Sequence, residues 1–334
     1  MGRSKIVNWV NSVYKLYSAK AKHISLPGFE KVPIYNVGVF YKNGLSNGAI
    51  GVRASAISFN FFVALFPGII FLFSLIPFIP IPGFQIELTE LIKQILPSNT
   101  YMAIEKTIID ITTNKRVSLL SFGFIAALFF STNGVSNMIA AFNATANAFE
   151  NRSWISTRVI GMPLVLVLVI LTTIGTGLII FGKYILKYLV TKSIIHNGFS
   201  QVLFISGQWL IILFVAYVSI SLLYYFAPSK RDRYKFFSPG STVATILIIL
   251  TSLAFSYYLS HFGRYNKLFG SIGTLIALLI WLNINAFVLL IGFELNVSIR
   301  NARLFKKNKL ELSQSSQEYE KFYPKKEDLL KDLQ

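Results

Sequence analysis

The chain has 334 residues, of which 54% are hydrophobic and only 14% are charged. A soluble domain of average composition carries roughly a quarter of its residues as Asp, Glu, Lys or Arg, so this composition excludes a disordered chain, a coiled coil and an ordinary soluble enzyme. The absence of cysteine excludes disulfides, thiol catalysis and cysteine-ligated metal centres. The net charge of +18 would indicate nucleic-acid binding in a soluble protein, but basic loops on one side of a membrane produce the same excess.

Six long windows of the sequence contain no charged residue at all. They cover residues 54–86, 117–149, 159–182, 193–229, 236–263 and 268–293. A helix that crosses the hydrocarbon core needs about 20 mostly apolar residues, and every window exceeds that length. The sequence therefore predicts an all-α polytopic membrane protein with six transmembrane helices, at 55–79, 119–147, 159–184, 201–226, 239–262 and 270–297.

The basic residues predict how the chain is oriented. An even number of spans places both termini on the same side of the membrane, and 23 of the 32 Lys and Arg residues fall in the termini and in the loops that share this side. Because cytoplasmic loops collect Lys and Arg, we expect both termini in the cytoplasm and the protein in the bacterial inner membrane. This topology explains the net charge without a nucleic-acid partner.

Three regions lie outside the spans. Residues 1–52 form a cytoplasmic region whose apolar residues between Ile6 and Tyr17 have helical spacing, which predicts an amphipathic helix on the membrane surface or else a solvated basic arm. The external loop 80–117 carries two apolar stripes separated by a break at 97–99, and thus predicts two short amphipathic helices that cover the core or cap a cavity. Residues 300–334 mix Lys with Glu and are expected to form a charged, flexible cytoplasmic tail.

The second span carries the densest set of polar side chains. On a helical projection its amides and a serine share one stripe, while Val135, Met138 and Phe142 lie on the opposite face, which suits lipid or bulky packing. Amides are costly to bury in hydrocarbon unless they find partners, so the stripe is expected to face helices or water. It forms either the wall of a substrate path or a set of hydrogen bonds between helices. Its polar members are Asn133, Ser136, Asn137, Asn143 and Asn147.

Other polar residues fall in the first and last spans. Span one carries Asn60, and span six carries Asn283, Asn285, Glu294 and Asn296. Ionisable groups inside a membrane are candidates for function, and Glu294 is the one acidic residue in a predicted span. The alternative for Glu294 is an ion pair at the interface with Arg53, Arg152 or Arg158. These residues complete the set of substrate-path candidates.

Three stretches carry a resemblance to a known family. They are Arg53-Ala54-Ser55 through Leu65-Phe66-Pro67, then Pro239-Gly240-Ser241 with Phe262-Gly263-Arg264-Tyr265-Asn266, and finally Phe269-Gly270-Ser271-Ile272-Gly273 with Trp281 and Gly292-Phe293-Glu294-Leu295-Asn296. In this order they resemble the YihY/BrkB family of bacterial inner-membrane proteins, once labelled ribonuclease BN. Many relatives in this family place arginines along span two, whereas this sequence has Asn133 and Asn137.

The resemblance implies a six-helix inner-membrane protein linked to serum resistance or envelope lipid export. Combined with the polar stripes, it leads us to expect a transporter or flippase-like factor for a lipid or related amphiphile, with membrane lipids and envelope-biogenesis proteins as partners. We expect no catalytic residues, no metal and no cofactor, since the three histidines are far apart and no phosphate-binding loop is present. The alternatives are a non-transporting membrane scaffold and, less favoured by the residues, an RNA-cleaving enzyme.

Overall fold

The fold is described from a computed structural model. It covers residues 21–22, 24–47, 49–80, 85–86, 89–90, 93, 98–146, 153–192, 198–229, 235–261 and 263–322. Its helices are α2 (Ile34–Asn47), α3 (Ile50–Leu75), the 3-10 turn η1 (Ile76–Phe78), α5 (Ser98–Thr113), α6 (Val117–Thr145), α7 (Trp154–Thr191), α8 (Gly198–Phe226), α9 (Pro239–His261) and α10 (Gly263–Phe322). The amphipathic N-terminal helix expected between Ile6 and Tyr17 lies outside these residues.

The six predicted spans are confirmed. Among the described residues, six helices are long and apolar enough to cross a membrane: Ile50–Phe78, Val117–Thr145, Ile155–Thr191, Ser200–Phe226, Pro239–Leu259 and Leu275–Ser313. Each overlaps one predicted span, and their order along the chain is the predicted one. The protein is therefore an all-α, multi-pass membrane protein.

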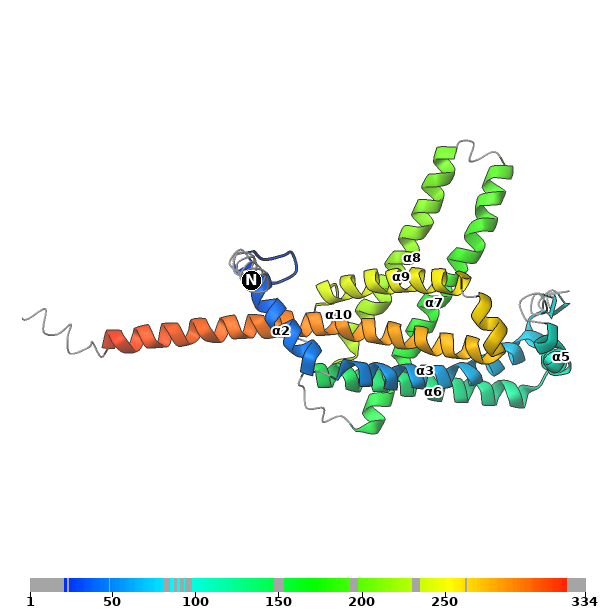
Figure 1. The fold of residues 1–334 in the computed structure, drawn as a ribbon, viewed down its shortest axis with the longest axis horizontal. Coiled ribbons are helices and arrows are strands. Elements are labelled where there is room, and N and C mark those ends of the chain that lie inside the picture. Colours follow the sequence, from blue (N-terminus) through cyan, green and yellow to red (C-terminus); the bar gives the residue numbers. More distant parts are fainter. Residues whose placement is uncertain are drawn as a thin grey trace, which may run out of the picture.

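Helices α3, α6, α9 and α10 run along the long axis of the molecule (Figure 1). Helix α2 crosses α10 at one end of the bundle that these helices form, and α10 continues beyond the crossing. We call this the α2 end, and the opposite end, where α5 and η1 lie, the far end. Small residues bring α3 and α6 close together: Gly123 lies against the backbone of Phe71, and Gly134 lies against the ring of Phe61. Small residues at membrane helix contacts allow this approach because no side chain separates the backbones.

The centre of the core is a contact among three aromatic rings from three helices. Phe142 of α6 stacks on Phe293 of α10 with ring centroids 4.3 Å apart. Tyr224 of α8 meets both rings edge-on or nearly so, at 5.5 Å from each. All three residues are fully buried. The face of α6 that carries Val135, Met138 and Phe142 thus packs against protein, which is the second of the two roles expected for it.

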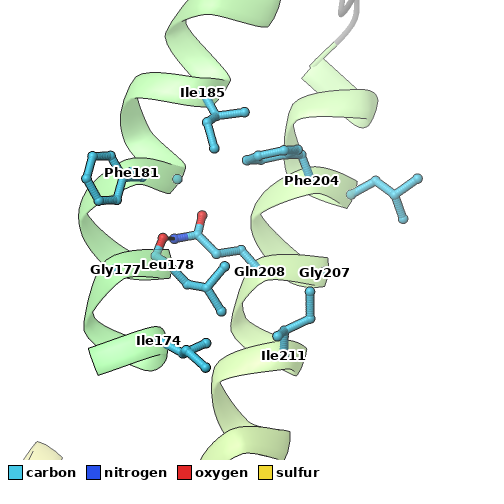
Figure 2. Close-up of a pocket in the computed structure, with 11 residues that line it drawn as sticks. Ile174, Gly177, Leu178, Phe181, Ile185, Phe204, Gly207, Gln208 and Ile211 are labelled. Carbon is cyan, nitrogen blue, oxygen red and sulfur yellow. Dashed lines mark hydrogen bonds between the residues drawn. The ribbon is translucent and has the colours of Figure 1, made fainter. Parts of the chain in front are cut away.

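Helices α7 and α8 form an antiparallel pair that leaves the other helices at a steep angle (Figure 1). Among the described residues, the buried hydrophobic side chains of the pair lie near the core, for example Leu164 and Val165 of α7 and Leu223 of α8. Farther out, Gln208 of α8 fits against Gly182 and donates from Nε2 to the Leu178 carbonyl at 2.7 Å. Figure 2 shows the pocket between the two helices at this point, with a volume of about 630 Å³ and an otherwise apolar lining.

The last helix corrects the predicted flexible tail. Helix α10 continues without a break from the membrane span to Phe322, well past residue 300. Lys, Glu, Leu and Gln are good helix formers, and the Lys307–Glu311 pair, with nitrogen and oxygen 3.5 Å apart, adds support at i,i+4 spacing. Tertiary contacts hold the start of this extension, because Ile299 and Ala302 pack against Val32 and Val37.

In the loop between the first two spans, the second predicted amphipathic helix is confirmed. Helix α5 begins at Ser98, where the break was predicted, and buries Tyr101 and Ile108. It contacts α3 and η1, so it covers the far end of the bundle. The first predicted stripe, from Leu88 to Ile95, falls almost entirely outside the described residues.

Candidate functional site

The polar residues of the spans fall into two groups. The α6 stripe consists of Asn133, Ser136, Asn137 and Asn143, and it runs along one side of α6. The α2-end cluster consists of Glu294 and Asn296 of α10 with the residues that contact them. Asn147 lies outside the described residues.

The middle of the α6 stripe is at the surface of the protein rather than in its core. Ala140 and Ala144 on this side are exposed, and Asn133 and Asn137 are half-buried. Ser136 Oγ is buried, and no described residue forms a hydrogen bond with it. A polar face that is partly open along a membrane helix offers partners to water or to the polar part of a lipid.

An arginine from the next helix joins the stripe. Arg158 of α7 donates from Nη2 to Asn133 Oδ1, and its guanidinium lies 4.3 Å from the centroid of the Phe129 ring. Arg158 is half-buried and lies inside the third span. Sequence reasoning treated Arg158 only as a possible partner of Glu294, although its position just before a charge-free window was visible.

The end of the stripe at Asn143 has a different environment. Asn143 is 2% exposed, and its Oδ1 accepts a hydrogen bond from the Ser229 backbone N–H at 2.9 Å. It thereby fixes the chain just after the end of α8. Its Nδ2 is buried, and no described residue accepts a hydrogen bond from it. Of the stripe residues, Asn143 is the one that lies inside the bundle as expected.

Glu294 is buried beneath α2. It is 5% exposed, and Ser298 Oγ donates to its Oε1 at 3.3 Å. A Cβ atom at Gly44 of α2 would overlap the carboxylate, so glycine at this position lets α2 cross directly over it. The ion pairs of the described residues do not include Glu294, although Arg53 is close enough to interact electrostatically. The alternative of a close ion pair with Arg53 or Arg158 is thus not what the structure has.

Two neighbours of Glu294 extend the polar cluster. Arg53 of α3 donates from Nη1 to Thr145 Oγ1 at 3.1 Å, which ties the start of α3 to the end of α6. Tyr41 of α2 donates to the Ile291 carbonyl at 3.5 Å. Burial raises the pKa of Tyr41 above its ordinary value, and the nearby charge of Glu294 raises that pKa further. Sequence reasoning missed α2, although Ile34, Val37 and Phe40 show the spacing of a helix.

Asn296 has a structural role at the start of α9. Its Oδ1 accepts from the Gly240 backbone N–H at 2.8 Å, and its Nδ2 donates to Ser238 Oγ at 2.8 Å. The first N–H groups of a helix lack partners within it, and Asn296 supplies one from α10. Next to this contact, Cβ atoms at Gly240 and Gly292 would overlap backbone atoms of the opposite helix. The Tyr224 hydroxyl closes the region by donating to the Leu289 carbonyl at 2.6 Å.

The remaining candidates do not join a common site. Asn283 donates to Ser55 Oγ at 3.1 Å, so it links α10 to α3. Asn60 and Asn285 each donate to a carbonyl four residues earlier in their own helix. Each of these three amides thus donates to a partner other than the α6 stripe, Glu294 and Asn296.

The motif residues mostly mark close helix contacts. Pro67 lies inside α3, Pro239 opens α9, Trp281 is half-buried in α10, and Gly273 is buried. For Gly263, Tyr265, Asn266 and Gly270 the structure describes the helical backbone only. Within the described ranges, no three His, Asp or Glu side chains come together in a way that could hold a metal ion.

The comparison with known families decides the relationship. The family model "Virulence factor BrkB" matches residues 43–317, which include every described span. The chain belongs to the BrkB family. It is thus an integral membrane protein of the BrkB/UPF0761 group, and the three quoted motif stretches fall within the matched region.

Individual BrkB relatives extend this result. The chain is 30% identical over 258 residues to a ribonuclease-like protein, YfkH, of Bacillus subtilis (strain 168), covering 77% of this chain and 91% of the relative. It is 22% identical over 269 residues to a UPF0761 membrane protein of Haemophilus influenzae (strain 86-028NP), covering 79% and 95%. A UPF0761 membrane protein of Idiomarina loihiensis is 25% identical over 134 residues, 40% of this chain and 47% of the relative. No solved structure matches the chain.

Proposed function

We propose that this BrkB-family protein moves a lipid or related amphiphile across the bacterial inner membrane, and that it is not an enzyme. In this proposal both termini are cytoplasmic, the α2 end faces the cytoplasm, and membrane lipids are the substrates. The amphiphile's polar group travels along the α6 stripe while its acyl chains stay in the bilayer.

One observation carries the proposal, namely the contact between Arg158 and Asn133 on a partly open face of α6. A cation inside a membrane span is costly unless it has a partner or a role. Here the guanidinium binds the Asn133 amide and lies against the Phe129 ring, on the same helix as exposed Ala140 and Ala144. An anionic or zwitterionic headgroup is the species in a membrane that would gain most from this cation.

The splayed α7–α8 pair supports the same function. The buried hydrophobic side chains of this pair lie near the core, and Asn133, Asn137 and the two alanines of α6 are not buried. A lipid in the bilayer can therefore reach the α6 stripe. The apolar pocket beside Gln208 is suited to an acyl chain, since its lining is aliphatic and aromatic apart from one amide (Figure 2). A polar face and an apolar groove that share the helix α7 match the two parts of an amphiphile.

Reconstitution in liposomes tests the proposal. Purified protein is expected to speed the movement of a fluorescent phospholipid between leaflets, measured by loss of fluorescence to an impermeant reductant. Charge-assisted hydrogen bonds contribute about 1.5–3 kcal/mol, so Arg158→Gln should slow movement by about tenfold or more. The matched control is Arg116→Gln, which removes an exposed arginine at the far end that pairs with Asp110.

The same assay discriminates between the alternatives. Asn137→Leu should also slow lipid movement while protein abundance is unchanged, because Asn137 is half-buried. If Asn137→Leu lowers abundance instead, its role is packing. Wild-type protein that moves no phospholipid would count against transport, and cleavage of RNA by the purified protein would count against a non-enzymatic function.

One observation favours a second candidate, a membrane scaffold. Helix α10 continues beyond the bundle to Phe322, and four large apolar residues in the last part of the sixth span are exposed: Leu304, Phe305, Leu310 and Leu312. Exposed apolar side chains on a projecting helix are typical of a protein-binding surface. Loss of function on changing these residues, with lipid movement intact, would favour the scaffold.

A further inference from the structure

A small polar pocket lies at the α2 end, apart from the α6 stripe. It is enclosed by the segment around Glu30, by the start of α9 at Ser238 and by Arg300 and Arg303 of α10, with Lys235 at its edge. Its volume is about 50 Å³. This is more than one water molecule requires, but it is too small for an acyl chain.

The charges around the pocket are unequal. Lys235, Arg300 and Arg303 contribute three positive charges, and Glu30 contributes the one negative charge among the lining residues. Glu30 bridges two of the cations: its Oε1 lies 3.2 Å from Lys235 Nζ, and its Oε2 binds Arg303 Nη1. The pocket therefore already binds one oxyanion, and its lining keeps a net charge of +2.

The segment that carries Glu30 has an unfavourable backbone conformation at two residues. Glu30 and Lys31 have φ values of 52° and 62°, in the left-handed region that side-chain-bearing residues rarely adopt. Gly28 lies so close to Pro239 that a Cβ atom would be 2.7 Å from its ring. Lys306 Nζ donates to the Lys31 carbonyl at 3.0 Å. The contacts with Lys235, Arg303 and Lys306 thus hold Glu30 and Lys31 in this conformation. An anion that replaces the Glu30 carboxylate would let these two residues relax.

The depth of the pocket indicates what reaches it. The fifth span begins at Pro239, which is part of the pocket lining. The sixth span continues to Ser313, past Arg300 and Arg303. We infer from the start of the fifth span and from these two cations that the pocket lies at the level of the lipid headgroups. The side chains of Lys235 and Arg303 are 68% and 63% exposed, so a headgroup can reach both of them.

We propose that this pocket binds a phosphate group, either in an anionic lipid headgroup or as free phosphate, in competition with the Glu30 carboxylate. Arginine binds phosphate through two parallel N–H groups, and lysine adds a point charge. This inference goes beyond the proposed function, since binding at the pocket does not require any lipid to move.

The test measures binding to the full-length protein. Native mass spectrometry of the purified protein, titrated separately with phosphatidylglycerol, phosphatidylcholine and inorganic phosphate, gives the retention of each. Arg303→Gln should lower the affinity for phosphatidylglycerol about fivefold, the factor that one basic residue near an anionic leaflet supplies. Glu30→Gln should raise that affinity, because it removes the competing anion. If free phosphate is the natural ligand, the same two changes will affect inorganic phosphate more than the lipid.

The opposite signs separate a binding site from a structural ion pair. The control pair is Arg116→Gln and Asp110→Asn, whose ion pair of 2.7 Å lies at the far end and should alter neither affinity. Where Arg303→Gln lowers the melting temperature too far, Lys235→Gln replaces it. The inference is wrong if Glu30→Gln does not raise the retention of phosphatidylglycerol or of phosphate. In that case Glu30 only forms structural ion pairs with Lys235 and Arg303. Binding that persists in a protein that moves no lipid would overturn the proposed function alone.

Discussion

Gly240 and Gly292 let the backbones of α9 and α10 come closer than any larger residue permits. Beside them Asn296 caps α9 through two hydrogen bonds of 2.8 Å. The three residues together set the position of the fifth span against the sixth. Packing thus gives a structural reason for all three residues, and the two hydrogen bonds of Asn296 make it a cap of α9.

Replacing Gly240 by alanine should destabilise the protein. The added Cβ would overlap the Gly292 carbonyl, which is backbone and cannot rotate away, and overpacking of this kind costs about 1–3 kcal/mol. Thermal unfolding in detergent is the measurement. Gly207→Ala is the matched control, because nothing lies within 4 Å of a Cβ there and alanine favours a helix by up to about 1 kcal/mol. Equal melting temperatures for the two variants would contradict the close contact.

For single residues, the sequence predicted which polar side chains matter better than it predicted their hydrogen-bond partners. Amides on a membrane helix must be satisfied, so Asn133, Asn143 and Asn296 could be singled out from composition alone. Which atom satisfies each one depends on helices distant in the chain: Arg158 lies 25 residues from Asn133, and Ser229 lies 86 residues from Asn143. Spacing within a single helix carries no information about such contacts.

Among the elements, α2 has the least expected role. It crosses α10 directly over the buried Glu294, and the crossing depends on Gly44. Tyr41 of α2 lies close enough to Glu294 for the charge of the carboxylate to raise the pKa of the tyrosine. Helix α2 therefore covers the carboxylate of the sixth span and separates it from the solvent at the α2 end.

A single methyl group should loosen α2. In Gly44→Ala the new Cβ would overlap the Glu294 carboxylate, so either this buried carboxylate turns aside or α2 moves away, and both loosen the contact. We expect faster amide hydrogen exchange across Ile34–Asn47, while the exchange of α3 and α6 is unchanged. Gly38→Ala changes the same helix at a position with nothing within 4 Å, and it should leave exchange unchanged or slower. Identical exchange in the two variants would show that Gly44 is not a point of close contact.

The elements that were predicted well are those set by local chemistry. Each span is a long charge-free window, and such a window can satisfy its backbone groups in a membrane only as a helix. Helix α5 followed from the spacing of Ile104, Ile108 and Ile111. The extension of α10 was missed because Lys- and Glu-rich segments form either a helix or a flexible chain. Packing of Ile299 and Ala302 against Val32 decides between them here.

For the whole molecule, the absence of cysteine gives a direct test of orientation. Single cysteines can be introduced without removing others, so Ser313→Cys on α10 and Asp110→Cys at the far end each report one side. In intact cells an impermeant maleimide should label Asp110→Cys and spare Ser313→Cys. Both should react after permeabilisation. The reverse pattern in intact cells would place the termini outside and refute the orientation derived from Lys and Arg.

The arrangement of the helices is the part that sequence did not predict. Length and hydropathy specify six spans, but they do not specify that α7 and α8 leave the others as a pair or that α6 buries its bulky face. Those features depend on which surfaces fit, for example the stack of Phe142 on Phe293 and the close approach of Gly134 to Phe61. Shape complementarity of this kind arises only when distant segments meet.

The uninterrupted length of α10 has a mechanical consequence. At about 1.5 Å per residue, its 60 residues correspond to about 90 Å of helix. Its first turns run at an angle to the rest, and its last part lies outside the bundle (Figure 1). A continuous helix resists bending. A force applied near Phe322 would therefore tilt the sixth span relative to the other helices. A partner that binds the outer end of α10 would therefore change the contacts of Glu294 and Gly292 at the α2 end of the bundle.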